Sequence, residues 1–402
     1  MNRVVITGAG TINALGATVP QTLEAMREGR LGIGALDFRD VERLSIKIGG
    51  QVHGFDAEAH FDRQKLGLYD RFTQFTLIAA REAVAQSGLT FSDELAETSG
   101  VVLGTAAGGM NTWDDNFRSV YEEGKNRVHP FVVPKLMTNA ATSHVSIEFN
   151  LQGPSLTVST ACASSNHAIG LAFQMVRSGM ARTMIAGGSE SMLTFGGIKA
   201  WEGLRVMSKT ACRPFSANRS GMVQGEGAGV FVLETYVDAK ARGAGILAEI
   251  VGFSMTSDAS DIVMPNKDGA ARAMRGALRD ARMDMSEIGY INAHGTGTAA
   301  NDKTECAAIV DVFGGHADQL MISSTKSMHG HLIGATGAVE LLACVMALRD
   351  GVIAPTLGYE SADPDCALDV VPNTARDAKV TGVISNAFAF GGMNAVLALK
   401  AV

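Results

Sequence analysis

Two segments of this 402-residue chain read as helices with almost no polar face, and they constrain the fold more than any other feature. Residues 338–348, AVELLACVMAL, hold one charged side chain, and residues 168–176, AIGLAFQMV, are apolar on most faces. A helix that is apolar all round is buried between other layers. Each of these helices follows a strand and a turn rich in Gly or Ser. Two buried helices in equivalent settings, one per half, predict a duplicated unit.

Short apolar strands alternate with helical stretches along the chain. This alternation predicts an α/β fold of packed layers. The charged stretch at residues 236–245 is the expected boundary, so we predict one half at residues 1–245 and the other at residues 246–402. The expected strands are residues 4–6, 100–104, 156–159, 183–186, 229–233, 290–292, 321–323, 380–384 and 395–399, and the expected helices are residues 71–87, 163–177, 269–281 and 338–348.

Charge, hydropathy and cysteine content argue against several classes of function. A net charge of −7 does not suit a surface that coats nucleic acid. The apolar runs stop short of the roughly 18–20 residues of a spanning helix, and the N-terminus lacks a secretory signal, so we expect no membrane insertion. Five scattered cysteines without metal-ligand spacing indicate a reducing, cytoplasmic setting and no metal site.

A glycine-rich turn after the first strand resembles a dinucleotide-binding loop but is incomplete. Gly8 and Gly10 match the fingerprint, whereas Asn13 occupies the place of its third glycine. We therefore expect no nicotinamide cofactor.

Cys162, in the segment TACASSNH, is the first candidate for chemistry. It follows the strand LTVS and begins a helix, where the helix dipole favours a thiolate over a thiol. Unpaired backbone N–H groups at such a turn can receive an oxyanion. A buried structural cysteine is the alternative interpretation. The strand-to-helix elbow favours a nucleophile, and the other four cysteines lie in ordinary contexts.

Three further segments carry polar or mobile groups beside apolar strands. In NAHGTGT, His294 lies among glycines that let a substrate approach its ring, with hydroxyls of Thr296 and Thr298 close by. The alternative is a histidine in a plain strand-end turn. In NAFAFGGMN, Phe388 and Phe390 precede Gly-Gly in a loop able to move, although for this motif by itself a simple turn with packed aromatics is the better interpretation.

The segment STKSMHGHLIGATG places Lys326 and His331 between a buried strand and a buried helix. Lysine is rarely fully buried without a partner, and Glu305 is an available one. A solvated polar loop is the alternative, weakened by the apolar segments on both sides. We expect His329 to lie at the surface or just behind the site.

Together these motifs resemble the β-ketoacyl-[acyl-carrier-protein] synthases, in the elongating type II branch. The resemblance rests on TACASS, AHGTGT, TKSMHGHLIGATG and FAFGGMN in the family's order and runs from the first strand to the last. SMHGH and SNAFA resemble the branch that contains nodulation protein E. The resemblance implies the thiolase fold, a five-layered αβαβα arrangement of two duplicated halves, and a homodimer.

The resemblance also implies a mechanism and the residues that perform it. Cys162 accepts an acyl chain from acyl carrier protein, and the N–H groups of Cys162 and Phe390 form the oxyanion hole. Neutral His294 and His331 stabilise the enolate formed when malonyl-carrier protein loses carbon dioxide. Lys326, paired with Glu305, orients His331.

Phe390 is the implied gate, and Thr296 and Thr298 contact the pantetheine arm, which carries both substrates without a resident cofactor.

Of three positions along the implied acyl tunnel, two carry smaller side chains than the common pattern. Ala107 replaces a frequent Ile, Val132 of the dimer mate replaces a frequent Phe, and Trp201 forms another aromatic wall. The two smaller side chains would deepen the tunnel, so we expect longer or unusual acyl chains to be accepted. Because carrier proteins are acidic, we also expect a local basic rim, with Arg63, Lys65, Arg127 and Arg205 as candidates.

Three other protein classes fit these motifs less well. A thiolase needs a second cysteine late in the chain, whereas Cys344 lies in a buried helix and Cys366 in a polar loop. A papain-like hydrolase matches the spacing of 132 residues from Cys162 to His294 but not the local cysteine motif, and it leaves Lys326 without a role. A chain-length-factor-like subunit, which shares the fold without catalysis, lacks the nucleophilic cysteine that is present here.

Overall fold

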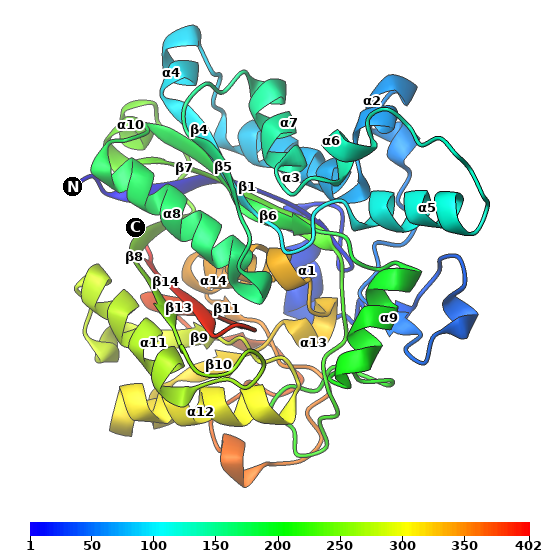
Figure 1. Ribbon diagram of the computed structural model, residues 1–402. Coiled ribbons are helices and arrows are strands. Elements are labelled where there is room, and N and C mark those ends of the chain that lie inside the picture. Colours follow the sequence, from blue (N-terminus) through cyan, green and yellow to red (C-terminus); the bar gives the residue numbers. More distant parts are fainter.

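A ten-stranded mixed sheet forms the centre of the protein, which a computed structural model describes over all of residues 1–402 (Figure 1). From one end to the other its strands are β10 (Met321–Ser323), β9 (Ile288–Asn292), β13 (Gly382–Ala389), β14 (Met393–Lys400), β8 (Ala248–Ser257), β1 (Val4–Asn13), β7 (Gly227–Thr235), β6 (Thr183–Glu190), β4 (Ser99–Gly104) and β5 (Ser155–Val158).

The sheet consists of two five-stranded halves with the same pairing pattern. They meet where β1 and β8 pair antiparallel, with Val4 opposite Ile250. Outward from this junction, β7, β6, β4 and β5 in one half correspond to β14, β13, β9 and β10 in the other. In each half the first three strands pair antiparallel, and the outer strands pair parallel. The sequence-based duplication is therefore confirmed, whereas the boundary at residues 245 and 246 stays a prediction.

Helices complete five layers around these strands (Figure 1). Two helices, α8 (Ser164–Ser178) and α14 (Thr336–Asp350), pack against each other between the two half-sheets. The outer face of the first half is covered by α3 (Arg71–Ser87) and α7 (Ala140–Phe149), and that of the second by α11 (Lys267–Ala281) and α12 (Ala299–Phe313). This αβαβα arrangement confirms the predicted thiolase-type fold and places the two apolar helices in the middle.

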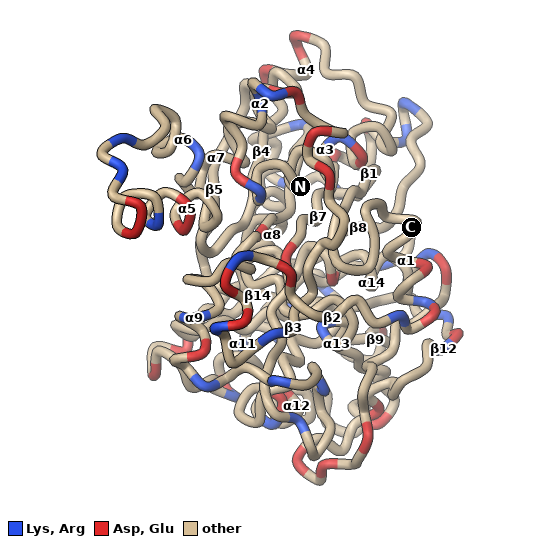
Figure 2. Tube along the Cα trace, turned by 90° about the vertical axis from the view of Figure 1, so that its right-hand side faces the viewer, with Lys and Arg blue, Asp and Glu red and all other residues tan.

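Shorter elements connect these layers. No helix is both long and apolar enough to cross a membrane. Figure 2 shows Lys and Arg spread over the trace together with Asp and Glu. The remaining helices are α1 (Val19–Glu28), α2 (Arg63–Leu68), α4 (Asp93–Glu97), α5 (Met110–Tyr121), α6 (Val132–Leu136), α9 (Phe195–Leu204), α10 (Tyr236–Ala241) and α13 (Lys326–His329), and the short strands are β2 (Gly34–Ala35), β3 (Ile48–Gly49), β11 (Val352–Ile353) and β12 (Arg376–Asp377).

A strained elbow precedes each central helix. The turns η3 (Ala161–Ala163) and η6 (Ile333–Ala335) lead into α8 and α14. Ala161 and Ile333 both have φ of +47°, a left-handed conformation that is unusual for residues other than glycine. Backbone strain of this kind is concentrated at functional sites. Its occurrence at equivalent places in both halves directs attention to the residues around these two elbows.

Candidate active site

Cys162 lies at the elbow between β5 and α8, at the point where the sequence predicts a nucleophile. The positive φ of Ala161 turns the chain so sharply that the next residue points into the space between the two halves. Cys162 is only 6% exposed. The backbone N–H groups of Cys162 and Phe390 both act to lower the pKa of its thiol, as donors close to the sulfur do. This is the pair that the family resemblance implies for the oxyanion hole.

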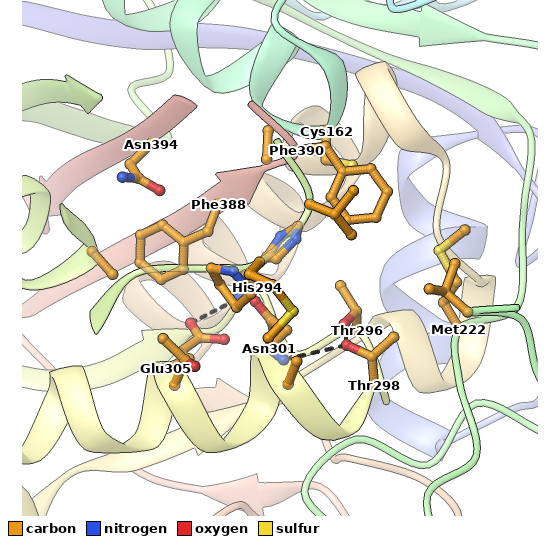
Figure 3. A pocket seen from close by; sticks show the side chains of 18 of the residues that line it. Cys162, Met222, His294, Thr296, Thr298, Asn301, Glu305, Phe388, Phe390 and Asn394 are labelled. Carbon is orange, nitrogen blue, oxygen red and sulfur yellow. Dashed lines mark hydrogen bonds between the residues drawn. The ribbon is translucent and has the colours of Figure 1, made fainter. Parts of the chain in front are cut away.

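The sulfur faces a cavity of about 150 Å³ that collects side chains from both halves (Figure 3). Thr296 and Thr298 lie on one wall and share a hydrogen bond of 2.8 Å between their hydroxyls. Trp201 stacks on Phe390 with ring centroids 5.9 Å apart. Of the residues singled out from the sequence, the cavity wall includes Cys162, Trp201, His294, Thr296, Thr298, Glu305, His331, Phe388 and Phe390.

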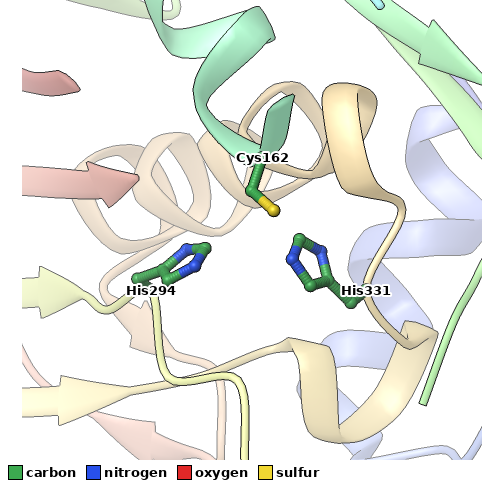
Figure 4. Close-up of side chains that lie close together, drawn as sticks. All are labelled: Cys162, His294 and His331. Carbon is green, nitrogen blue, oxygen red and sulfur yellow. The ribbon is translucent and has the colours of Figure 1, made fainter. Parts of the chain in front are cut away.

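Cys162, His294 and His331 converge on one point (Figure 4). The sulfur and one ring nitrogen of each histidine all lie within 4.8 Å of one another. The two rings are nearly perpendicular, with centroids 5.5 Å apart. His294 follows β9 and His331 follows α13, so both approach Cys162 from the second half of the fold.

Burial controls the protonation of all three groups. It raises the pKa of the Cys162 thiol to about 12, and the nearby Lys326 charge and the two N–H groups only partly offset this. Burial therefore outweighs the effect expected from the helix dipole and favours the thiol over the thiolate. Burial, the Lys326 charge and the neighbouring histidine hold the pKa of His294 well below its ordinary value, and burial, Lys326 and His329 do the same for His331. Both rings are neutral at neutral pH.

Hydrogen bonds define which nitrogen of His331 carries the proton. The N–H of Ile333 donates to His331 Nδ1 at 3.2 Å, so Nδ1 is an acceptor. Nδ1 also lies 2.8 Å from the Thr336 hydroxyl. The proton is thus on Nε2, which has no partner within the protein. A neutral ring therefore presents a free N–H donor at the cavity.

Comparison with known proteins agrees with this geometry. Residues 1–239 match the family described as "Beta-ketoacyl synthase, N-terminal domain", and residues 247–360 match "Beta-ketoacyl synthase, C-terminal domain". The chain belongs to the β-ketoacyl synthase family. It is 46% identical over 400 residues to nodulation protein E of Rhizobium sp. (strain N33), covering 100% of this chain and 99% of that protein. It is 42% identical over 405 residues to 3-oxoacyl-[acyl-carrier-protein] synthase 2 of Staphylococcus aureus (strain N315), covering 99% and 98%.

Solved structures agree with this membership. The ishigamide ketosynthase/chain length factor superposes with a TM-score of 0.95 at 36% identity, covering 100% of this chain and 99% of that one. AntDE:AntF, a type II polyketide acyl-carrier protein in complex with its ketosynthase, superposes with a TM-score of 0.90 at 30% identity, covering 100% and 99%. The β-ketoacyl synthase described here is a condensing acyltransferase that joins a malonyl group to an acyl chain during chain elongation.

The buried lysine of this synthase has a different partner from the one predicted. Lys326 Nζ lies 2.5 Å from Glu340 Oε1, and both side chains are essentially unexposed. Glu305 instead accepts from the backbone N–H groups of His294 and Gly295, both at 2.8 Å, and from the Asn386 amide at 3.1 Å. The predicted Lys326–Glu305 pair is therefore wrong. Glu305 already holds the His294 backbone, whereas Glu340 is the one charged residue of the apolar segment 338–348.

His329 lies behind the site and not at the surface, the second of the two places expected for it. It is 0% exposed and lies one residue before Gly330 and two before His331. Burial, followed by the Lys326 charge, lowers the pKa of His329 to about 3. It does not line the cavity, so it belongs behind the site.

The two remaining tunnel positions do not line the cavity of a single chain. Ala107 is half-buried and packs against the same apolar cluster as Cys162. Val132 is half-buried on α6, and its expected role requires a second chain. Neither Cys344 nor Cys366 reaches the cavity wall, which leaves no thiol in the place of a thiolase's second cysteine.

Glu190 is a buried residue of the site region that the sequence analysis missed. It accepts from the N–H groups of Ala106, Ala107 and Gly334, at 2.7, 3.2 and 3.0 Å, and from the Thr105 hydroxyl at 3.0 Å. It thereby links the loop of Ala107 to the elbow before α14. Burial raises the pKa of Glu190 to about 7, despite these bonds. A glutamate at the end of an otherwise uncharged strand was the signal available in the sequence.

The same three groups that converge at the cavity could offer ligands to a soft cation. Such binding needs a thiolate, which burial opposes, and the positive charge of Lys326 opposes a second cation beside the rings. The donor set therefore fits nucleophile and hydrogen-bond chemistry better than metal binding.

Proposed function

We propose that Cys162 carries the growing acyl chain as a thioester while His294 and His331 stabilise the malonyl-derived nucleophile beside it. The observation that carries this proposal is the convergence of one thiol and two neutral imidazoles within 4.8 Å in an enclosed cavity. Neutral rings donate hydrogen bonds without a formal charge, which suits a developing enolate oxygen.

The first step is acyl transfer. Cys162 Sγ attacks the thioester carbonyl of an acyl-carrier protein, a bond forms between the carbonyl carbon and Cys162, and the bond to the pantetheine sulfur breaks. The thiol proton passes to the departing pantetheine sulfur. His294 is the ring free to relay it, because His331 already carries its proton on Nε2 and no hydrogen bond engages the His294 side chain.

The second step is decarboxylative condensation. The bond between the malonyl carboxylate and its methylene carbon breaks, carbon dioxide leaves, and the electron pair moves onto the thioester oxygen beside His294 and His331. The enolate carbon then attacks the acyl carbonyl on Cys162, and the oxyanion accepts from the N–H groups of Cys162 and Phe390. Cys162 departs as a thiolate and takes one proton from water, which leaves a β-ketoacyl chain two carbons longer on the carrier protein. Each donor contributes about 3 kcal/mol.

The supporting residues keep this arrangement fixed. Burial, and after it the Lys326 charge, keeps the two rings neutral, and Glu305 holds the backbone of His294 and Gly295. Phe390, stacked on Trp201 above the cavity, acts as the gate, and Phe388 lies beside the His294 ring at 6.1 Å between centroids. Thr296 and Thr298 bind the pantetheine arm.

Acyl carrier protein is the proposed partner that delivers both substrates. Arg63, Arg127 and Arg205 are exposed, Lys65 is half-exposed, and none of the four forms an ion pair within the chain. Free cations of this kind suit an acidic carrier protein. Reversing the charge of Arg205 should raise the KM for carrier protein and weaken its dependence on salt. An unchanged KM would remove that residue from the docking surface.

A homodimer is proposed from the free end of the sheet. β5 is the terminal strand, with one edge unpaired, and an open edge of this kind is normally covered. Exposed apolar side chains lie nearby on α5, α6 and α7, including Phe117, Val133 and Ile147. Sedimentation of the purified enzyme should give twice the mass of the 42.1 kDa chain. A monomer at micromolar concentration would refute this.

A preference for long or unusual acyl chains is proposed from the small side chains Ala107 and Val132 and from Trp201. Full activity on short and medium chains with none beyond about palmitoyl would reject it.

The five unpaired thiols further support a cytoplasmic location.

The central proposal is tested by incubating the enzyme with acyl-carrier proteins and locating the acyl group by mass spectrometry. The wild type should be acylated on Cys162, and Cys162→Ser should lose acylation and elongation while keeping its fold. Normal elongation by the serine variant, or acylation elsewhere, would refute the assignment.

A further inference from the structure

His329 is a wholly buried imidazole that the proposed reaction does not use. It ends α13, and both of its ring nitrogens are engaged. Nδ1 lies 2.7 Å from the carbonyl oxygen of Gly330, and Nε2 lies 2.9 Å from the hydroxyl of Thr325. The ring therefore spans from the residue before α13 to the residue after it.

These two contacts fix the form of the ring. A carbonyl oxygen can only accept, so His329 Nδ1 carries the proton and donates to Gly330. Nε2 of the neutral ring is then an acceptor for the Thr325 hydroxyl. The imidazole acts as a rigid bridge with one donor end and one acceptor end.

The carbonyl that His329 binds belongs to the peptide group linking Gly330 to His331. The N–H of that same planar group donates to the Val223 carbonyl at 2.7 Å. The peptide is thus held at its oxygen by His329 and at its nitrogen by Val223. Because a peptide held at both ends cannot rotate, the direction in which the His331 side chain leaves the backbone is fixed.

The backbone of His329 itself has little room to shift. A Cβ added to Gly50 or Gly225 would come within 2.0 or 2.5 Å of the His329 carbonyl oxygen. These two glycines let neighbouring segments close against the end of α13. His329 therefore reaches Gly330 from a fixed base.

We propose that His329 is a positioning residue that orients His331 by clamping the Gly330–His331 peptide. The clamp keeps His331 Nε2–H directed at the substrate oxygen. This inference rests on the proposed function, because it concerns the step in which the His331 donor is used. It predicts that losing the clamp harms decarboxylation and condensation while sparing acyl transfer to Cys162.

The test compares two partial reactions in the full-length enzyme. Intact-protein mass spectrometry follows acylation of Cys162 by acyl-carrier protein, and release of labelled carbon dioxide follows decarboxylation of malonyl-carrier protein. His329→Phe keeps the ring shape but removes both hydrogen bonds. We expect it to slow decarboxylation about a hundredfold, the typical result of a misplacement of about 1 Å, and to change acylation by less than about threefold.

Two further variants separate positioning from general stability. His329→Gln offers both a donor and an acceptor and should restore decarboxylation to within about tenfold of the wild type, since the two hydrogen-bond roles are preserved. His316→Phe removes a comparable bond, from Nε2 to the Ile288 carbonyl at 2.9 Å, far from the cavity, and should leave both reactions unchanged.

Equal slowing of both reactions by His329→Phe, or no slowing of decarboxylation, would overturn the proposal. Failure of the wild type to be acylated on Cys162 would instead overturn the proposed function, and it would be seen before any variant is compared.

Discussion

The ion pair of Lys326 and Glu340 gives the sharpest quantitative prediction. The charged atoms are 2.5 Å apart, and the side chains are 0% and 1% exposed. At an effective dielectric constant of about 20 their attraction is about 7 kcal/mol, but each ion also loses several kcal/mol of hydration. Removing one partner leaves a bare charge in an apolar layer. Lys326→Met and Glu340→Gln should each lower the free energy of unfolding by about 3–5 kcal/mol.

The double variant should be far less destabilised than the sum of the single variants. It buries neither charge, so the hydration cost of both ions disappears together with their attraction. We expect its loss of unfolding free energy to stay at or below that of either single variant. The measurement is urea denaturation followed by the fluorescence of Trp113 and Trp201. Additive losses across the cycle would refute the reasoning, because they would mean that the two charges do not depend on each other.

The same variants test the electrostatic role of the lysine. Burial and then the Lys326 charge lower the pKa of His331 well below its ordinary value of 6.5. The ring therefore stays neutral at pH values below 6.5. Glu340→Gln keeps that positive charge, whereas the double variant lacks it. On acidification, the rate of decarboxylation should therefore begin to fall at a higher pH in the double variant than in Glu340→Gln. This fall is the acid limb of the pH–rate profile. Coincident acid limbs would show that the ammonium does not keep the ring neutral.

Three further predictions concern single positions. Gly330→Ala should cost about 1–3 kcal/mol in urea denaturation, because φ is +78° and the new Cβ would lie 3.0 Å from the Gln224 carbonyl. Burial raises the pKa of Glu190 from 4.5 to about 7, so its contribution to stability is complete below pH 4.5 and is lost as the pH rises through 7. The advantage of the wild type over Glu190→Gln should thus be about 2–3 kcal/mol greater at pH 5 than at pH 8. Ala107→Ile should shorten the preferred acyl chain, as measured by the product profile.

Local pattern predicted the layers of the fold well. The helix Arg71–Ser87 has the expected bounds, and the two apolar segments form the central layer. These features depend on hydrophobic periodicity and on the need to bury apolar faces. Both can be recognised from short stretches of consecutive residues. The convergence of Cys162, His294 and His331 was also predictable, because Cys162 and His294 follow strands, His331 lies between a buried strand and a buried helix, and the motifs occur in the family's order.

Side-chain partners across layers were not predictable in the same way. Lys326 could reach a carboxylate on α12 or on α14, and the sequence does not give the relative height of these helices. In the structure Lys326 forms its ion pair with Glu340, and Glu305 accepts a hydrogen bond from the backbone N–H of His294. A single charge in an apolar helix was the better signal, because a carboxylate buried there needs a partner more than one on a mixed helix does.

Burial raises the pKa of the thiol and lowers the pKa of the two imidazoles, so it favours the neutral form of all three groups. This distinguishes the site from that of a cysteine hydrolase. A hydrolase of the papain type depends on a thiolate paired with an imidazolium. Here burial raises the pKa of Cys162 and lowers those of His294 and His331, and the Lys326 charge further disfavours an imidazolium. An imidazolium beside the enolate would protonate it and end the reaction before a carbon–carbon bond forms. Keeping both rings neutral therefore protects the nucleophile, which gives Lys326 a role beside two histidines that must remain uncharged.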